Sequence, residues 1–209
     1  MKAHTKETQA SMTPEKALQY LKEGNKRFQN NLSTNRNLLQ QVNETTDGQF
    51  PFATILSCID SRVSAELVFD QGLGDIFSIR IAGNFVTEDI LGSMEFASKL
   101  AGTKLVVVLG HTSCGAIKGA CDHARMGNLT KLIQKIEPAV EAVIEPKDES
   151  LRNSNNLEFV DTVAAKNVKL TIDKIRAESP ILAEMEQKGE IMIVGAMYDL
   201  SDGSVSFDI

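Results

Sequence analysis

The sequence predicts an α/β fold, with a mainly parallel sheet of four to five strands flanked by helices. Three observations support this prediction. Short apolar, β-branched runs alternate along the chain with longer segments of helical periodicity. The strand-like runs are apolar on both faces, as in parallel strands that helices cover on both sides. The 209 residues, 42% of them hydrophobic, are enough to build the core of one domain.

The N-terminal quarter is predicted to contain one helix. Residues 1–12 are polar and are expected to be disordered. Thr13 can cap a helix whose first residue is Pro14. Because its apolar stripe is thin, we expect a helical arm over residues 13–31 that could pack on a partner subunit as readily as on its own. The polar residues that follow, 31–49, are expected to be irregular. Residues 13–209 together are expected to form a single domain.

Five apolar runs are predicted to form the strands. The clearest is 104–109, which is β-branched, apolar on both faces and closed by Gly110, so we expect it to be central. An Asp-Gly turn precedes the short last strand. The predicted strands are 52–57, 76–81, 104–109, 190–197 and 205–207.

Helices are predicted between these strands. The longest, 157–178, repeats apolar residues at helical spacing. The polar connection 145–156 is expected to be a surface loop. The predicted helices are 65–70, 87–100, 115–126, 129–144, 157–178 and a short one from Pro180.

Charge and composition exclude several functional classes. A net charge of -6 argues against a basic face for nucleic acid. No apolar run reaches the roughly 20 residues needed to span a bilayer, so we expect no membrane partner. Three cysteines are too few for a disulfide framework and favour metal or catalytic use in a reducing compartment. We expect a cytoplasmic protein, or a periplasmic one if a leader was removed upstream.

Residue types that bind metals follow two of the predicted strands. Cys58 comes directly after 52–57, and His111 and Cys114 follow 104–109. The carboxyl ends of neighbouring parallel strands share one edge of a sheet, so these three side chains meet if the two strands are neighbours. Two thiolates and one imidazole suit Zn²⁺, and three protein ligands leave a fourth position for water, as in catalytic zinc sites.

An acid and a base accompany the first cysteine. Asp60 and Arg62 stand two and four residues beyond Cys58. A carboxylate paired with a guanidinium stays ionised and fixed in orientation, so it can accept a hydrogen bond from a zinc-bound hydroxide. The plainer alternative is that Asp60 and Arg62 form an ordinary surface ion pair. We favour it less because the two residues stand so close to Cys58.

The motifs Cys58-Ile-Asp-Ser-Arg62 and His111-Thr-Ser-Cys-Gly115 resemble those of the β-class carbonic anhydrases. The resemblance extends from about Thr13 to Ile209. It implies an enzyme that carries out the zinc-dependent, reversible hydration of carbon dioxide to bicarbonate and a proton. It also implies Cys58, His111 and Cys114 as ligands of one zinc ion per subunit, with Asp60 and Arg62 as a catalytic dyad that orients the hydroxide.

The resemblance further implies a substrate pocket. Gln49 and Phe77 match the glutamine and the first aromatic residue of one subgroup, and Phe96 stands where that subgroup often has tyrosine, which removes a hydroxyl. Such residues would give carbon dioxide an apolar wall and one amide donor. The chain has no tryptophan, a residue of the regulatory bicarbonate site in the other subgroup. We therefore expect the open, plant-like subgroup, with Asp60 on zinc only in a closed, low-pH form.

The resemblance also bears on partners, and two rival functions stand beside it. The resemblance implies a homodimer, or a homotetramer of dimers, with the active site at the subunit interface. One rival function is hydrolysis of carbonyl sulfide or carbon disulfide at the same site. Another is a structural zinc domain, which is less favoured because no fourth Cys or His lies near the motifs. His123 could relay protons but is more simply a surface histidine, and Cys121 is more simply a small buried residue.

Overall fold

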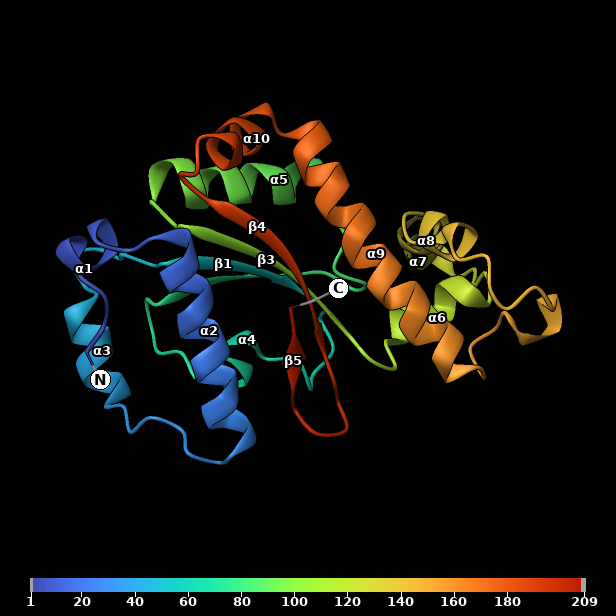
Figure 1. Ribbon diagram of the computed structural model, residues 1–209, viewed down its shortest axis with the longest axis horizontal. Coiled ribbons are helices and arrows are strands. Elements are labelled where there is room, and N and C mark those ends of the chain that lie inside the picture. Colours follow the sequence, from blue (N-terminus) through green and yellow to red (C-terminus); the bar gives the residue numbers. More distant parts are fainter. Residues whose placement is uncertain (1, 208–209) are drawn as a thin grey trace.

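The computed structural model describes residues 2–207 (Figure 1). In this part of the chain, five strands form one sheet in the order β2-β1-β3-β4-β5. The first four are parallel, and β5 runs antiparallel to β4. The predicted fold class is thus confirmed, with β3 central as expected. The strands are β1 Ala53–Ser57, β2 Ile76–Arg80, β3 Leu105–His111, β4 Met192–Tyr198 and β5 Val205–Ser206.

Helices cover both faces of the sheet. Successive strand residues point to opposite faces, so Ile55 and Val107 pack into one core cluster, whereas Leu56 and Val108 pack into another. The first cluster includes buried residues of two helices, and the second those of three. Figure 1 shows these two groups on opposite sides of the sheet: α2 (Pro14–Gln29) and α4 (Ala65–Val68), against α5 (Glu88–Glu95), α9 (Leu157–Glu178) and α10 (Pro180–Gln187).

A third cluster lies beside the N-terminal half of α9. Three short helices pack there with Phe159 and with Cys58, which follows β1. The segment predicted as one helix, 129–144, is two helices, because Pro138 lacks the N–H that a continuous helix would use. The three helices are α6 Gly115–Cys121, α7 Gly127–Gln134 and α8 Glu137–Ala142, and the exposed loop after them holds the 3₁₀ turn η2, Glu149–Leu151.

The N-terminal segment is more ordered than the sequence indicates. Helix α1 (Lys6–Ala10) occupies part of the segment expected to be disordered. The side chain of Thr5 caps it, and the Gln9 side-chain amide donates hydrogen bonds to the carbonyls of Pro51 and Ala101. The expectation of disorder is therefore wrong for residues 6–10, because contacts with distant residues hold this helix in place.

Two further expectations about this region need correction or extension. The segment 31–49 contains α3 (Leu38–Glu44), capped by Asn37, and is thus not wholly irregular. Helix α2 begins with the Thr13 cap and Pro14 as predicted. Its buried residues Ala17 and Leu21 pack on the chain's own sheet. Met1 and residues 208–209, at the ends of the expected 1–12 and 13–209 ranges, lie outside the described residues.

The order in which the chain adds strands to the sheet reverses between β1 and β3. From β1 it passes to β2 on one side, and from β3 it passes to β4 on the other. Ligands of open α/β sheets bind at such a point, outside the carboxyl ends of the strands. Among the described helices, none is long and apolar enough to cross a membrane.

Candidate metal centre

Three metal-binding side chains meet where β1 and β3 end. Cys58 follows β1, His111 is the last residue of β3, and Cys114 precedes α6. Because β1 and β3 are paired neighbours, the ligand atoms of these residues all lie within 4.8 Å of one another, and all three residues are buried. The prediction that they come together is confirmed.

The donor set fits a tetrahedral zinc ion. The two Sγ atoms of Cys58 and Cys114 lie 3.9 Å apart. Two thiolates bound to tetrahedral zinc at about 2.3 Å would lie about 3.8 Å apart. The buried Nε2 atom of His111 has no hydrogen-bond partner among the described residues, and its Nδ1 atom lies 2.9 Å from the carbonyl oxygen of Thr112. If Nδ1–H donates to that carbonyl, the lone pair of Nε2 is left free for a metal.

The two thiols influence each other's ionisation. The contact with Cys114 lowers the pKa of the Cys58 thiol, and the same contact, together with burial, raises the pKa of the Cys114 thiol. A single proton shared between the sulfurs produces these opposite directions, because a second negative charge so close to the first is unfavourable. A bound divalent cation would remove that opposition, since it favours both thiolates.

Hydrogen bonds from Gly83 and Arg80 fix the loop that carries Cys58. The N–H of Gly83 donates to the Sγ atom of Cys58 at 3.4 Å. The Arg80 guanidinium, at the end of β2, donates to the carbonyl oxygens of Cys58 at 2.9 Å and of Asp60 at 2.6 Å. Arg80 is a site residue that sequence reasoning misses. Arg80 ends β2, which pairs with β1, and this pairing becomes known only from the strand order.

Asp60 and Arg62 form a two-pronged ion pair beside this loop. Arg62 Nε donates to Asp60 Oδ1 at 2.9 Å, and Nη2 donates to Oδ2 at 2.7 Å. Hydrogen bonding to Arg62 lowers the pKa of the Asp60 carboxyl, and the His111 ring contributes in the same direction. The Asp60 side chain is 15% exposed and that of Arg62 is 57% exposed. The carboxylate is therefore held ionised at the rim of the centre.

The second loop, between His111 and Cys114, is anchored from two sides. The Thr112 N–H donates to the carbonyl of Tyr198, and its hydroxyl accepts the N–H of Leu200, each at 3.0 Å. The Ser113 N–H donates to the Asp161 carboxylate of α9 at 2.7 Å. Asp161 is thus, after Arg80, a second site residue that sequence reasoning misses.

The three expected substrate residues lie elsewhere in the chain. Gln49 precedes β1, whereas Cys58 follows it, so the strand separates them. Phe77 and Phe96 contact each other edge to face, with ring centroids 6.4 Å apart, and line a groove of about 630 Å³. Phe96 begins a π-helical turn, η1 (Phe96–Leu100), where the sequence predicts ordinary helix. In the described part of the chain, the structure does not bring these three residues to the metal ligands.

His123 and Cys121 match their plainer interpretations. The His123 side chain is 63% exposed, and its ring nitrogen lies 3.1 Å from the Glu137 carboxylate. Cys121 is buried, and burial raises the pKa of its thiol to about 11. Neither belongs to the cluster of metal-binding side chains among the described residues.

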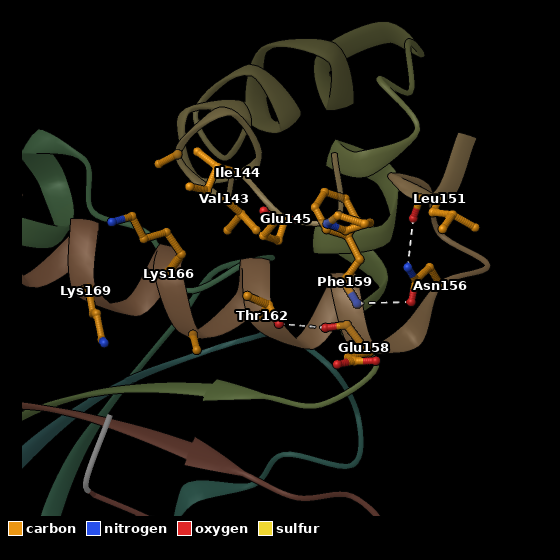
Figure 2. A pocket seen from close by; sticks show the side chains of 13 residues that line it. Val143, Ile144, Glu145, Leu151, Asn156, Glu158, Phe159, Thr162, Lys166 and Lys169 are labelled. Carbon is orange, nitrogen blue, oxygen red and sulfur yellow. Dashed lines mark hydrogen bonds between the residues drawn. The ribbon is translucent and has the colours of Figure 1, made fainter. Parts of the chain in front are cut away.

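A sizeable cavity of the described chain lies apart from this centre. It has a volume of about 680 Å³ and separates α9 from the segment that follows α8. Figure 2 shows Val143 and Ile144 on one side of it and Phe159, Thr162 and Lys166 of α9 on the other. None of the three converging metal-binding side chains lines this cavity.

Comparison with known proteins agrees with this arrangement. A family model described as carbonic anhydrase matches residues 53–205. Carbonic anhydrase 2 of Mycobacterium tuberculosis is 36% identical over 198 residues, which cover 91% of this chain and 90% of that protein. The β-carbonic anhydrase CafA of Aspergillus fumigatus superposes with a TM-score of 0.71 at 25% identity, covering 79% of this chain and 78% of that one. This chain belongs to the β-carbonic anhydrase family.

The family explains the donor set. β-Carbonic anhydrases are zinc enzymes, and Cys58, His111 and Cys114 offer the zinc-type site of this carbonic anhydrase. The fold also matches two tetrameric β-carbonic anhydrases of Sordaria macrospora, with a TM-score of 0.66 at 23% identity, covering 77% of this chain and 82% of that chain.

Proposed function

We propose that this chain catalyses the reversible hydration of carbon dioxide to bicarbonate and a proton, with one zinc ion per subunit held by Cys58, His111 and Cys114. The observation that carries the proposal is the convergence of their ligand atoms within 4.8 Å at the switch point of the sheet. When bound there, zinc supplies a Lewis acid that lowers the pKa of a water molecule in its fourth position to about 7.

Asp60 orients the attacking water. Asp60 Oδ1 already accepts two hydrogen bonds from Arg62, from its backbone N–H and its Nε, whereas Oδ2 accepts one, from Nη2, and can accept another. Ionised Asp60 can accept hydrogen bonds but cannot donate them. The attacking oxygen must therefore turn its hydrogen to Asp60 and its lone pair to the carbon of the substrate. Arg62 keeps the carboxylate ionised and fixed. This intact pair supports the open, plant-like subgroup, in which Asp60 reaches the metal only when the pair breaks at low pH.

The substrate pocket is completed by a second subunit. At about 3.3 Å per residue, β1 puts Gln49 more than about 13 Å from the Cys58 of its own chain. Phe96 is 52% exposed, and Leu73, which lines a pocket together with Gln49, is 44% exposed, as suits residues of an interface. Gln49, Phe77 and Phe96 would then line the centre of the partner in a homodimer. A tetramer of dimers is the extension that the Sordaria macrospora enzymes suggest.

The same proposal covers domain limits and compartment. Residues 13–209 are proposed to form one catalytic domain. A reducing compartment such as the cytoplasm suits the chemistry, because two thiols 3.9 Å apart must remain free to bind the metal.

Stopped-flow measurement of carbon dioxide hydration with a pH indicator tests the function. The samples are the zinc-loaded protein, a metal-stripped sample, Cys58→Ser, Asp60→Asn and, as a matched control on the exposed side of α9, Asp173→Asn. We expect hydration that is lost with the metal and in Cys58→Ser, falls about 10²-fold or more in Asp60→Asn, and is unchanged in Asp173→Asn. Stoichiometric zinc without hydration between about pH 6 and pH 9 would refute the proposal and make carbonyl sulfide the next substrate to assay.

A further inference from the structure

Ser113 has an unusual backbone conformation between two metal-binding residues. Its φ angle is +54°, in the left-handed region that side chains other than glycine disfavour. His111 ends a strand, and Cys114 stands directly before a helix. The turn at Ser113 is what directs both side chains to one point. A conformation that is unfavourable in itself persists only if the surroundings hold it.

Asp161 supplies that support from α9. Its Oδ1 atom accepts the Ser113 N–H at 2.7 Å, a short hydrogen bond to a carboxylate. In the described part of the chain, no lysine or arginine forms an ion pair with Asp161, so the loop is its main partner.

Helix α9 places this carboxylate rigidly. Its neighbours Val160 and Ala164 are buried in the core cluster that also contains Cys58 and Cys114. Gly110 lets the helix approach the end of β3, since a Cβ atom there would lie 2.7 Å from Val168. Asp161 is not among the residues that line the cavity of Figure 2, where Glu158, Thr162 and Lys166 lie. Asp161 instead faces the metal-binding loop, where it contacts Ser113.

We propose that Asp161 is a positioning residue of the metal centre, which holds Ser113 in the left-handed conformation and thereby sets the spacing of His111 and Cys114. The proposal rests on the zinc site of the proposed function and deepens it. Thr112 anchors the loop on its other side, through β4. Without Asp161 the Ser113 N–H loses its partner, the turn relaxes, and one ligand or the other leaves the metal more often.

The experiment measures how fast zinc leaves the full-length, zinc-loaded protein for a colorimetric chelator in excess. The variants are Asp161→Ala, Asp161→Asn, Ser113→Gly and the double variant Asp161→Ala/Ser113→Gly, with Asp173→Ala as the control on the same helix. We expect release about tenfold faster in Asp161→Ala, the lower end of the range for groups that support metal ligands. In Asp161→Asn, whose amide oxygen still accepts the hydrogen bond, release should stay within about twofold of the parent.

The double variant separates positioning from a general loss of stability. Glycine adopts a positive φ without steric cost, so Ser113→Gly should restore most of the slow release in the Asp161→Ala background. Thermal unfolding is recorded in parallel. Unchanged zinc release in Asp161→Ala overturns the inference. It is also overturned if Asp161→Ala lowers the unfolding midpoint and the double variant releases zinc as fast as Asp161→Ala does. Full zinc in Cys58→Ser would instead refute the zinc site itself, which keeps the two failures distinct.

Discussion

The side-chain amide of Asn167 donates a hydrogen bond to the backbone carbonyl of Gly83 at 2.8 Å. Asn167 lies on α9 and Gly83 in the loop after β2, and both are buried. The Gly83 N–H in turn donates to the Sγ atom of Cys58. A long helix on one face of the sheet thus fixes the donor that contacts a metal-binding sulfur.

Replacing Asn167 with alanine should destabilise the fold. The Gly83 carbonyl would be left buried without its partner, at a cost of about 1–3 kcal/mol. For a chain of this length, each kcal/mol lowers the unfolding midpoint by about 2–4 °C. Differential scanning calorimetry of Asn167→Ala should therefore show a midpoint several degrees lower. Asn155→Ala, at an exposed position, serves as the control, and equal midpoints for both variants would contradict the account.

Zinc content should distinguish the cysteines. Cys58→Ser removes a ligand from the centre and should abolish stoichiometric zinc. Cys121→Ala should retain about one zinc per subunit, because Cys121 lies outside the cluster and burial keeps its thiol protonated. Elemental analysis after gel filtration measures both. Loss of zinc in Cys121→Ala alone would mean that the ligand set is wrong.

The Asp70 ion pairs should make stability depend on acid pH. Burial alone would raise the pKa of the Asp70 carboxyl, but hydrogen bonds from Arg27, Arg36 and Thr34 outweigh it and hold the pKa at about 2, below its ordinary 3.8. A carboxyl whose native pKa is depressed contributes stability above the unfolded value, and this contribution is lost as the pH falls through the native value.

Asp70→Asn should therefore lower the free energy of unfolding by about 3 kcal/mol at neutral pH, as when one partner of a buried pair is removed. The difference from the parent should stay constant down to about pH 4 and narrow below it. Urea unfolding over this range measures it. Asp173→Asn, at an exposed position, should show no such trend, and a difference that widens below pH 4 would reverse the assigned sign.

Mixing two inactive variants should restore activity if the pocket is shared between subunits. A mixed dimer of Gln49→Ala and Cys58→Ser contains one centre with an intact Cys58 and, from the other chain, an intact Gln49. Random reassociation should then recover about one quarter of the parent activity. If Gln49 served its own chain, both centres of the mixed dimer would be defective. Refolding the variants together and separately, followed by the hydration assay, decides between the two.

The elements predicted well are those with a strong local pattern. The apolar spacing of 157–178 gives the bounds of α9, and the β-branched run 104–109 gives the central strand. Helix α1 is missed because its order depends on Gln9 contacts with residues far along the chain. The π-helical turn at Phe96 is missed because sequence periodicity does not distinguish it from ordinary helix.

The candidate site divides in the same way. Cys58, His111 and Cys114 can be predicted because each follows a recognisable strand and has a metal-binding side chain. Asp161 and Asn167 cannot, because their roles depend on which loops α9 crosses. A faint signal exists for Asn167, a polar residue between Ala164 and Val168 on the buried stripe of the helix.

The pairing of β1 with β3 has a consequence for how the protein acquires its metal. All of β2 and α5 lies between Cys58 and His111 in the chain, so bringing them together closes a long loop, which costs conformational entropy. An ion that binds both residues favours only conformations in which that loop is already closed. During refolding, zinc capture would therefore report when the two strands meet, and zinc in the medium would promote assembly of the sheet itself.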